Sequence, residues 1–497
     1  MESNCRCGSL RRAAVLVLVC VVTAIVLPGQ TLTTLATFDG TNGANPIFGP
    51  LAQGLDGNLY GTTNGGGSYG PNCVPGCGTV FKITPTGMLT TLYSFCIQTN
   101  CADGAYPLAG LVLATDGSLY GTTNGGGPSS NCAGGCGTVF KIAASGMLTT
   151  LYSFSLADGA YPESALFQGT NGNFYGTTQS GGTNGGYGTV FEITRSGMLT
   201  TLHSFDGTDG QRPVAGLVQA TNGNFYGTTV NGGTYGNGTV FTMTPSGTLT
   251  TLRSLYNKVG RNPYGVLVQA ANGDFYGTTD NGGNYDEGTV FQISPHGILT
   301  TLYSFAPPAI NPSSGLMQAT DGNWYGTTTS NDDNNGVYFG GVMFSMTPGG
   351  TVTNLYDFCL QNFTPPLSCP DGSFPNGTLM QATNGNFYGT TTYGGLSTDC
   401  SNQSPTGGCG TVFMFSVGLG PFIKTLPASG KIGSAVKILG TTLTGATSVT
   451  FNGVPATFTV VRASEITTTV PTGATTGTVQ VVTPTAALTS NVAFRVR

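Results

Sequence analysis

The chain has 497 residues, of which 80 are Gly and only 7% are charged. With 21 Tyr, 27 Phe and no collagen-like triplet period, this composition is typical of a turn-rich all-β protein long enough for more than one domain. The formal net charge of −5, with 16 Lys and Arg, excludes the concentrated basic surface that nucleic acid binding needs, so no nucleic acid partner is expected.

The first residues have the pattern of an export signal. Arg11 and Arg12 precede the apolar run 13–27, which is at the upper length limit for a signal-peptide core and short for a spanning helix. Because the small-residue cleavage pattern is poor, residues 1–30 are interpreted as a signal peptide or an uncleaved N-terminal anchor. Membrane contact is expected only through this segment, if it is retained.

A phrase ending in Tyr-Gly-Thr-Thr recurs seven times along the chain. Its tyrosines are separated by intervals near 50 to 60 residues, which are typical of propeller blades and related β arrays. The seven are Tyr60, Tyr120, Tyr175, Tyr226, Tyr276, Tyr325 and Tyr388.

One copy of the unit, 214–255, predicts four short strands. Strand A is "GLVQA", B is "FYGTT", C is "GTVFTMT" and D is "LTTLRSL". A joins B through "TNGN", where Asn-Gly would supply the positive φ angles of a tight hairpin, and C joins D through "TPSG". The Phe and Tyr of strand B are expected on opposite faces, with Gly allowing a close approach. A binding ring made of the seven tyrosines is the alternative interpretation.

The ends of the repeat region predict how the array closes. The seventh "GTVFMFS" (410–416) is followed by no "LTTL", whereas an unmatched "LTTLATF" (32–38) begins the region. A closed ring gains from this split because the N-terminal strand completes the last blade and pairs its edge. We therefore predict a seven-bladed β-propeller over 31–417, closed by the N-terminal strand. An open β-solenoid, which would usually carry atypical caps, is the alternative.

Ten cysteines fall into five local couples in the loops that follow strands B or D. Those two kinds of loop emerge at one end of an antiparallel blade, so all ten are expected on one face. An even count in an exported chain favours disulfides. The couples are Cys73/Cys77, Cys96/Cys101, Cys132/Cys136, Cys359/Cys369 and Cys400/Cys409. Zinc is the alternative for the two CxxxC couples, but each is isolated in its own blade, and no metal or other cofactor is expected.

A second phrase, of the form Asp-Gly-x-x-Pro, recurs before strand A, near the mouth of the predicted central channel. The residue before Pro varies among aromatic, amide and Arg side chains, which would suit sugar or peptide recognition. These ligand-binding candidates are Asn45, Tyr106, Tyr161, Arg212, Asn262, Asn311 and Phe374. The recurring acids, Asp103, Asp158, Asp209 and Asp371, are counted with them, although an Asx turn that stiffens the loop is their simplest role.

No catalytic motif identifies an active site. GxSxG, HExxH, a P-loop and a dinucleotide fingerprint are all missing, so no catalytic residue is assigned. Two of the 21 acidic residues could still converge across the ring, as in glycosidases.

Residues 422–497 predict a small β-sandwich from short alternating apolar segments and frequent Gly, Pro and Thr turns. This part resembles IPT/TIG domains, which are immunoglobulin-like modules of exported and surface proteins. Thr442 is a departure, since the family often has Asn there. The resemblance is carried by Pro427, Ser429, Gly430, Gly433, Val436, Ile438, Gly440, Leu443, Val449, Phe451, Asn452, Gly453, Val470, Pro471 and Phe494.

The repeat region, through its "NGNFYGTT…GTVF…LTTLYSF" units over 32–416, resembles the bacterial choice-of-anchor tandem-repeat GloVer-containing proteins. That resemblance implies export and often attachment to the envelope, and it implies no reaction. We therefore expect an exported extracellular or cell-envelope binding scaffold, rather than an enzyme, whose ligand is a glycan or a protein. A polysaccharide-active glycosidase or lyase on the propeller is the alternative.

The strand directions also predict a polarity. The N-terminal strand and the connection into the sandwich should both lie at the end of the propeller opposite the cysteine-bearing loops.

Overall fold

A computed structural model describes residues 30–68, 73, 76–332, 338–360, 369–397, 400 and 407–497. The predicted signal or anchor therefore lies outside the described residues, apart from Gln30. The described part is all-β, with a single 3₁₀ turn at Thr99–Cys101 and no α-helix. No helix in that part is both long and apolar enough to cross a membrane.

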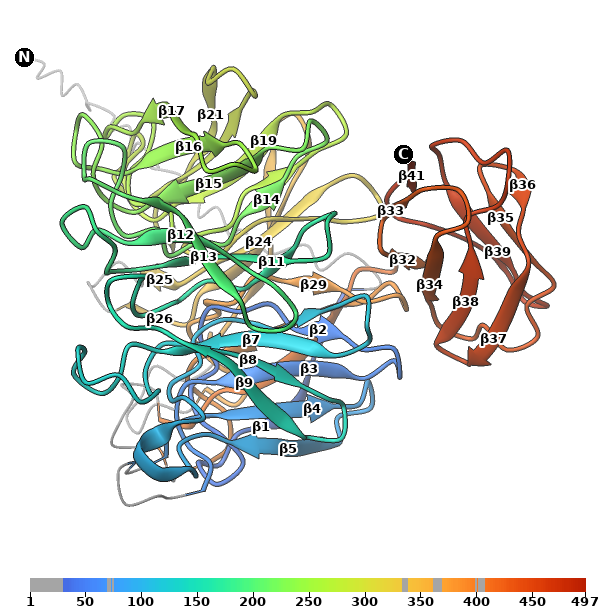
Figure 1. Cartoon of the computed structure of the whole chain (residues 1–497), viewed down its shortest axis with the longest axis horizontal. Helices are drawn as coiled ribbons and strands as arrows, with labels where there is room; N and C mark the ends of the chain where they lie inside the picture. The colour runs from blue at the N-terminus through green and yellow to red at the C-terminus, as the bar shows by residue number, and fades with distance from the viewer. Residues whose placement is uncertain are drawn as a thin grey trace, which may run out of the picture.

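Seven four-stranded antiparallel sheets form the larger body (Figure 1). The A strands are β2 (Ala52–Gln53), β6 (Val112–Leu113), β10 (Phe167–Gln168), β14 (Val218–Gln219), β18 (Val268–Gln269), β23 (Met317–Gln318) and β29 (Met380–Gln381). The B strands are β3 (Leu59–Thr63), β7 (Leu119–Thr123), β11 (Phe174–Thr178), β15 (Phe225–Thr229), β19 (Phe275–Thr279), β24 (Trp324–Thr328) and β30 (Phe387–Thr391).

The C strands are β4 (Thr79–Ile83), β8 (Thr138–Ile142), β12 (Thr189–Ile193), β16 (Thr239–Met243), β20 (Thr289–Ile293), β27 (Val342–Met346) and β31 (Thr411–Ser416). The D strands are β5 (Leu89–Ser94), β9 (Leu148–Ser153), β13 (Leu199–Ser204), β17 (Leu249–Ser254), β21 (Leu299–Ser304), β28 (Val352–Asp357) and β1 (Thr31–Thr37). The sixth unit adds a small sheet of β22 (Ala309–Ile310), β25 (Ser330–Asp332) and β26 (Tyr338–Phe339).

The N-terminal strand completes the seventh sheet, as predicted. The strand order there is β1-β31-β30-β29, and β1 runs antiparallel to β31 with Thr31 opposite Ser416 and Thr37 opposite Thr411. Seven buried apolar clusters each contain residues of two neighbouring sheets, and one of them joins the seventh sheet to the first. The sheets are therefore linked in a cycle of propeller-like blades.

The tyrosines of the repeated phrase are buried between sheets, with at most 5% of their surface exposed. Where the next strand B begins with an aromatic residue, each Tyr packs on it with ring centroids 4.0–4.4 Å apart. These pairs are Tyr120–Phe174, Tyr175–Phe225, Tyr226–Phe275, Tyr276–Trp324 and Tyr325–Phe387. This burial excludes a binding ring made of the seven tyrosines.

The glycine of the phrase leaves room for side chains of its own sheet. In β15, a Cβ on Gly227 would lie 2.6 Å from the Phe241 ring and 2.8 Å from Leu217. Phe241 is the residue directly opposite Gly227 in the ladder, and its ring folds over the missing side chain. The same contact recurs at the corresponding glycine of all seven sheets.

The A-to-B turns differ from the prediction. Gly223 has a φ of +91°, but Asn222 is not left-handed, so "TNGN" is not a two-residue type I′ hairpin. Asn222 instead accepts a hydrogen bond from the backbone N–H of Asn224 through Oδ1 at 3.0 Å, an Asx turn. The longer connection from Ala220 to Asn224 lets the turn be made with one left-handed residue.

The C-terminal part is a sandwich of two four-stranded sheets around one apolar core. One sheet has the order β32 (Lys424–Leu426), β34 (Ala435–Leu439), β38 (Glu465–Thr469), β37 (Phe458–Arg462), and the other β36 (Val454–Pro455), β35 (Ser448–Phe451), β39 (Val479–Val482), β40 (Ala487–Thr489). Outside these two sheets, β33 (Ser429–Gly430) near the start of the sandwich pairs in parallel with β41 (Arg495–Val496) at its end. Thr442 has a φ of +57°, a conformation that Asn tolerates better than a β-branched residue.

The two ends of the repeat body have different roles. We call the end with the B-to-C and D-to-A connections the loop face, and the end with the A-to-B and C-to-D turns the turn face. The sandwich packs on the turn face, where Ser464 donates to the carbonyl oxygen of Leu55 at 2.6 Å and the N–H of Phe422 to that of Thr383 at 3.0 Å. The predicted polarity is confirmed, since β1 also begins on this face.

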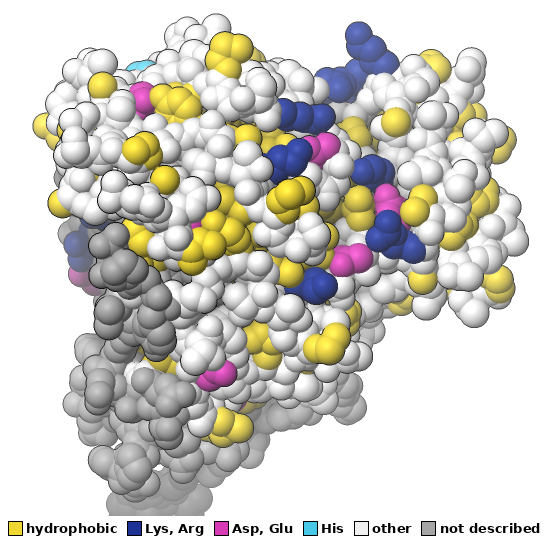
Figure 2. Space-filling view, turned by 60° about the horizontal axis from the view of Figure 1, so that its bottom comes forward, with side chains coloured by type: hydrophobic (Ala, Val, Ile, Leu, Met, Phe, Trp, Pro, Cys, Tyr) yellow, Lys and Arg dark blue, Asp and Glu magenta, His cyan; other side chains and the backbone are white. Residues whose placement is uncertain are grey.

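Charged side chains gather along the junction between the sandwich and the turn face (Figure 2). Lys424 lies within it, and its Nζ donates to the carbonyl oxygen of Gln381 at 2.6 Å, 5.6 Å from the centre of the Phe422 ring. Burial lowers the pKa of this ammonium to about 8. The junction therefore contains a lysine whose charged form is disfavoured by the loss of contact with water.

Because the Phe241 ring lies where a Cβ of residue 227 would be, one methyl group added at Gly227 should have a large effect on stability. Gly227→Ala should lower the free energy of unfolding by about 1–3 kcal/mol, because the ring must leave its site. Gly420→Ala, where no atom lies within 4 Å of the new Cβ, is the control and should leave stability nearly unchanged. Thermal or denaturant unfolding of both variants measures the difference, and equal stabilities would contradict the packing argument.

The pairing of β1 with β31, which we call the seam, predicts that stability depends on β1. A chain beginning at residue 41 should aggregate or lose cooperative melting, because it exposes the edge of β31. The reference is the same chain beginning at residue 30, and calorimetry with light scattering compares the two. Identical melting would show that the seventh sheet does not need the N-terminal strand.

Lys424 predicts a pH-dependent junction. Its docked pKa of about 8 lies below the ordinary 10.5, so the undocked state holds more protons between these values. Docking stability should therefore rise from pH 8 to pH 10.5 and stay level below pH 8. Lys424→Met should remove this rise when sandwich unfolding is followed across that range. Parallel pH profiles for the two proteins would contradict the assignment.

Candidate functional site

The seven residues before the recurring Pro share a strained backbone. Their φ angles lie between +55° and +58°, although none is Gly. Each N–H donates into the B-to-C loop of the preceding sheet, as Tyr106 does to Cys77 at 2.8 Å, and each carbonyl accepts from the residue after the next strand B, as from Asn124 at 3.0 Å. Such strain persists where the surroundings enforce it, and it clusters at functional sites.

The side chains at these seven positions divide into two groups. The amides of Asn45, Asn262 and Asn311 donate to backbone carbonyls at 3.0–3.1 Å, so they hold neighbouring loops together. Tyr106 is 41% exposed, and Phe374 packs edge-on against Tyr393 at 5.6 Å. The partly exposed Tyr161 and Arg212 donate no side-chain hydrogen bond within the described part of the chain. The aromatic and Arg side chains therefore lack the hydrogen bonds that hold the three Asn side chains within the described part of the chain.

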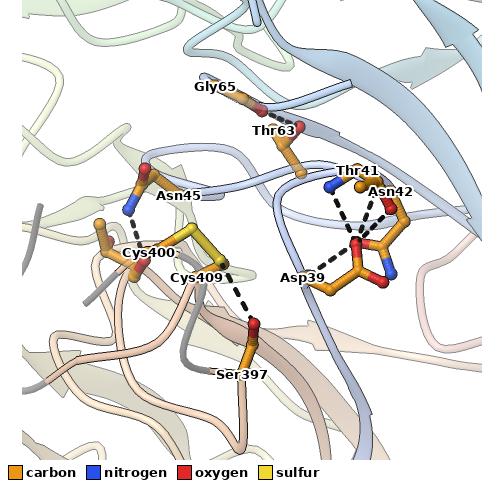
Figure 3. Close-up of a disulfide and its surroundings, with 10 residues drawn as sticks. Asp39, Thr41, Asn42, Asn45, Thr63, Gly65, Ser397, Cys400 and Cys409 are labelled. Carbon is orange, nitrogen blue, oxygen red and sulfur yellow. Dashed lines mark hydrogen bonds between the residues drawn. A yellow bond between two sulfur atoms is a disulfide. The ribbon is translucent and has the colours of Figure 1, made fainter. Parts of the chain in front are cut away.

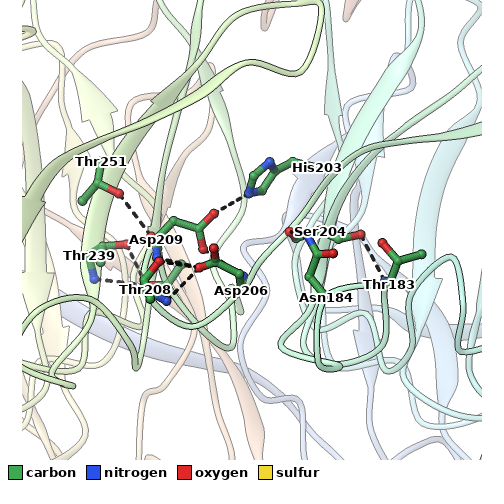
Figure 4. Close-up of polar contacts among 10 residues, drawn as sticks. Thr183, Asn184, His203, Ser204, Asp206, Thr208, Asp209, Thr239 and Thr251 are labelled. Carbon is green, nitrogen blue, oxygen red and sulfur yellow. Dashed lines mark hydrogen bonds and ion pairs between the residues drawn. The ribbon is translucent and has the colours of Figure 1, made fainter.

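The four recurring Asp residues are occupied within their own loops. Tyr93, Tyr152 and Tyr356 of the D strands donate to Asp103, Asp158 and Asp371 at 2.6–2.9 Å. In the fourth loop the ring of His203 takes the place of Tyr, with Nε2 2.6 Å from Asp209 (Figure 4). Their carboxylates also accept backbone N–H groups, so these acids stiffen the loop face and present little to a ligand.

The loop that follows β1 replaces this Asp with an amide. Asn42 accepts the N–H of Asp39 at 3.0 Å, and Asp39 accepts two backbone N–H groups in return (Figure 3). Asn45 reaches from the same loop to the seventh sheet, close to the Cys400–Cys409 couple. The loop face is therefore closed across the seam as well as within each sheet.

All five cysteine couples form disulfides in the predicted pairing, with Cα–Cα distances of 4.0–5.5 Å, and all lie on the loop face. The bonds are Cys73–Cys77, Cys96–Cys101, Cys132–Cys136, Cys359–Cys369 and Cys400–Cys409. Each closes a short stretch of a single loop, so none of them links two different loops.

The cysteines lie deeper than their position in surface loops suggests. Cys136, Cys369 and Cys409 have 0% of their surface exposed. The reason is packing, since Cys136 belongs to the same apolar cluster as Tyr120 and Phe154, between the second and third sheets. These three residues are therefore not available to a ligand, and their disulfides anchor the loops to the core beneath them.

One sulfur cluster has the spacing of a metal site. The sulfur atoms of Cys73, Cys77 and Cys96 lie within 4.8 Å of one another. A soft metal could use that spacing, but these sulfurs belong to two disulfides here, and a metal needs free thiolates.

Further aromatic side chains stand on the loop face beside sheets four and five. Tyr235 and Tyr285, at the tips of the B-to-C loops, are 60% and 61% exposed. Tyr235 lies 5.6 Å from the ring of Tyr256, over which Arg253 also stands. Exposed rings held by loops are suited to stacking on a ligand.

A cavity of about 150 Å³ lies where the segments before the A strands converge. Six of the seven sheets contribute to its lining, which is largely apolar and includes Phe48, Leu166, Val214, Leu217 and Val266. This is the centre of the cycle of sheets, beneath the ring of left-handed residues.

Two titratable groups, Glu163 and Tyr264, line the cavity, and a third, Asp280, accepts a hydrogen bond from Ser313 of the lining. Burial raises the pKa of the Glu163 carboxyl, although the Arg212 guanidinium acts to lower it. Burial also raises the pKa of Asp280, despite hydrogen bonds from Ser313 and Asn281, and that of the Tyr264 phenol. Perturbed groups that converge on a cavity are typical of functional sites.

The sequence analysis missed these residues. Glu163, Tyr264, Ser313 and Asn376 occupy the position directly after the recurring Pro, and Asp280 directly follows a Tyr-Gly-Thr-Thr phrase. A signal in the sequence could have found them, because both positions vary among otherwise similar units. Each position also holds an acid in one unit only, Glu163 after the Pro and Asp280 after the phrase.

Three solved structures that resemble this chain are distant from it in sequence and in fold score. A gluconolactonase from Xanthomonas campestris is 12% identical, with 56% of this chain and 78% of that chain covered and a TM-score of 0.35. A periplasmic gluconolactonase from Pseudomonas aeruginosa is 17% identical, covering 72% and 99%, with a TM-score of 0.43. The extracellular domain of a putative one-component system from B. thetaiotaomicron is 10% identical, covering 93% of this chain and 58% of that chain, with a TM-score of 0.46. At these scores, none supports a statement on activity or ligand.

No curated protein matches the sequence at a significant level. The Gloeobacter/Verrucomicrobia repeat matches residues 20–185, 129–339 and 218–454, and the IPT/TIG domain matches 421–496. Together, the matches to the repeat span most of the chain and include all seven of its Tyr-Gly-Thr-Thr phrases. The chain therefore belongs to the Gloeobacter/Verrucomicrobia repeat family and carries a C-terminal IPT/TIG domain.

Proposed function

We propose that this protein is an exported surface-binding scaffold, a closed seven-bladed propeller whose loop face binds a glycan or a protein. The observation that carries the proposal is a set of aromatic and Arg side chains held in left-handed backbone on that face. The sandwich and the start of β1 occupy the opposite face, so the loop face is left free to meet a ligand.

Export is supported by two features. Five disulfides persist best in an oxidising compartment, and the apolar run 13–27 has the length of a signal-peptide core. If that run is retained, it would leave the protein from the turn face and hold the loop face away from the membrane.

Closure of the ring matters for binding because it fixes the loops relative to one another. Each left-handed residue is bonded to the sheet before it, so the loop face behaves as one preorganised surface. Preorganisation lowers the entropy that binding costs.

A polysaccharide-active enzyme is the second candidate, and Glu163 with Asp280 is the observation that favours it. Both carboxyls have raised pKa values, as a general acid requires, and both act electrostatically on Tyr264. However, Asp280 accepts hydrogen bonds from Ser313 and Asn281 at 2.5 Å, which occupies the oxygens that a reaction would need. A reproducible release of sugars from mixed polysaccharides, lost in Glu163→Gln, would favour the enzyme over the scaffold.

The chain offers a matched test of the binding face. Tyr106→Asn and Tyr161→Asn introduce the residue found at three equivalent positions, Asn45, Asn262 and Asn311, so the left-handed backbone is kept. The melting temperature should stay level or rise, because Asn tolerates this conformation. Affinity for a ligand identified on a glycan array or by cross-linking to surface proteins should fall at least tenfold, about 1.4 kcal/mol.

The control lies on the other face. Met147 is 72% exposed in a C-to-D turn, and Thr248 occupies the equivalent position of another sheet. Met147→Thr should leave binding unchanged. A loss of affinity in Met147→Thr but not in the Tyr variants would move the binding surface to the turn face.

A further inference from the structure

The central cavity has an unusual charge content. Of its nineteen lining residues, all of them described, Glu163 is the one that carries a charge. Arg212 acts on Glu163 electrostatically, but it does not line the cavity. Aromatic rings of Phe48, Phe167 and Tyr264 form part of the wall.

Two acceptors that line this cavity, the Glu163 carboxyl and the Asn376 amide oxygen, have no hydrogen-bond donor among the described residues. Within the described part of the chain the Glu163 carboxyl accepts no hydrogen bond, and it interacts electrostatically with Arg212 and Tyr264. Asn376 donates through Nδ2 to Thr392 at 3.0 Å, which leaves its buried Oδ1 without a partner. A buried acceptor without a donor is destabilising, and more so when it is charged, so both groups would gain from a ligand that brings N–H donors.

The geometry points to a binding site for a small organic ammonium, a primary amine on an apolar body of about six carbon atoms. The ammonium would pair with Glu163 and donate to Asn376, while the body fills the space beside Leu166, Val214 and Val266. An apolar cavity of 150 Å³ holds a benzene-sized molecule. The aromatic wall adds attraction for a cation.

A neutral sugar fits this cavity less well. Its hydroxyl groups need donors and acceptors on all sides, whereas the lining is mostly apolar. An anion would meet Glu163 without a compensating cation in the wall. The amine site goes beyond the proposed function, because the ligand lies inside the cycle of sheets and not on the loop face.

Benzylamine and benzyl alcohol are suitable probes, since they differ chiefly in the charged group. Titration calorimetry at pH 7.5, with the chain beginning at residue 30, should show benzylamine binding at least tenfold more tightly than benzyl alcohol. Glu163→Gln should remove this preference. Glu192→Gln is the matched control, because Glu192 is bound by Asn173 and Tyr175 of the third sheet and does not line the cavity.

A second variant keeps the test valid if Glu163→Gln alters stability. Val214→Phe fills the cavity and keeps the Glu163 carboxyl, and it should abolish binding of both probes. Benzylamine affinity should also decrease as the pH is lowered, because Glu163 becomes protonated. This decrease should begin at a higher pH than for an ordinary glutamate, since the pKa of Glu163 is raised. Equal affinity for the two probes, or undiminished benzylamine binding in either Glu163→Gln or Val214→Phe, would overturn the proposal. Neither result would alter the loop-face test with Tyr106→Asn.

Discussion

Packing between consecutive B strands holds the repeat body together. Each Tyr of the repeated phrase leaves its own sheet and packs on the first residue of the next strand B, while the adjacent Gly accepts a Phe ring from strand C. The two residues act together, because the ring over Gly fills one face of the strand and Tyr extends from the other. A single short phrase therefore specifies both the interior of a sheet and its contact with the next sheet.

This packing leaves the loop face free to vary. The recurring Asp residues and the left-handed residues before Pro are held by bonds that mostly use the backbone, so side chains there change from sheet to sheet without loss of the frame. Conserved geometry with variable chemistry is what a recognition surface on a rigid scaffold needs. The turn face is used differently, since the sandwich and its half-buried Lys424 rest on it.

The sequence alone predicted the number of sheets, the split seventh sheet, the cysteine couples and the position of the sandwich. These features follow from periodicity and strand direction, which act along the chain and need no knowledge of distances. The burial of Cys136 and Cys369 was not predicted, because it depends on how far a loop sinks between two sheets. The Asn-Gly turns were wrong because the same dipeptide can make different hairpins. In the sandwich Asn452 and Gly453 both take positive φ angles, whereas Asn222 does not.

The cavity could not be predicted in the same way. Glu163, Tyr264 and Asn376 come from three different sheets and meet only because the cycle closes. Nothing in the local pattern around any of them distinguishes a residue that faces the cavity from one that faces solvent. Sites assembled across repeats are accessible to sequence reasoning only when one position of the unit is compared through all copies.

The pairing of β1 with β31 also sets an order of events during biosynthesis. Within the repeat body, β1 precedes the other strands and pairs only with β31, the last of them, so it has no partner until residue 416 has emerged. During that interval β1 is an unpaired edge attached to a growing chain, and such edges are prone to pair wrongly. Sheets one to six can each form as they appear, because their strands are consecutive, but the ring is completed by a contact of very high sequence separation. Such late, long-range closure slows folding far more than it weakens the finished protein, since the entropy of closing a loop grows only with the logarithm of its length.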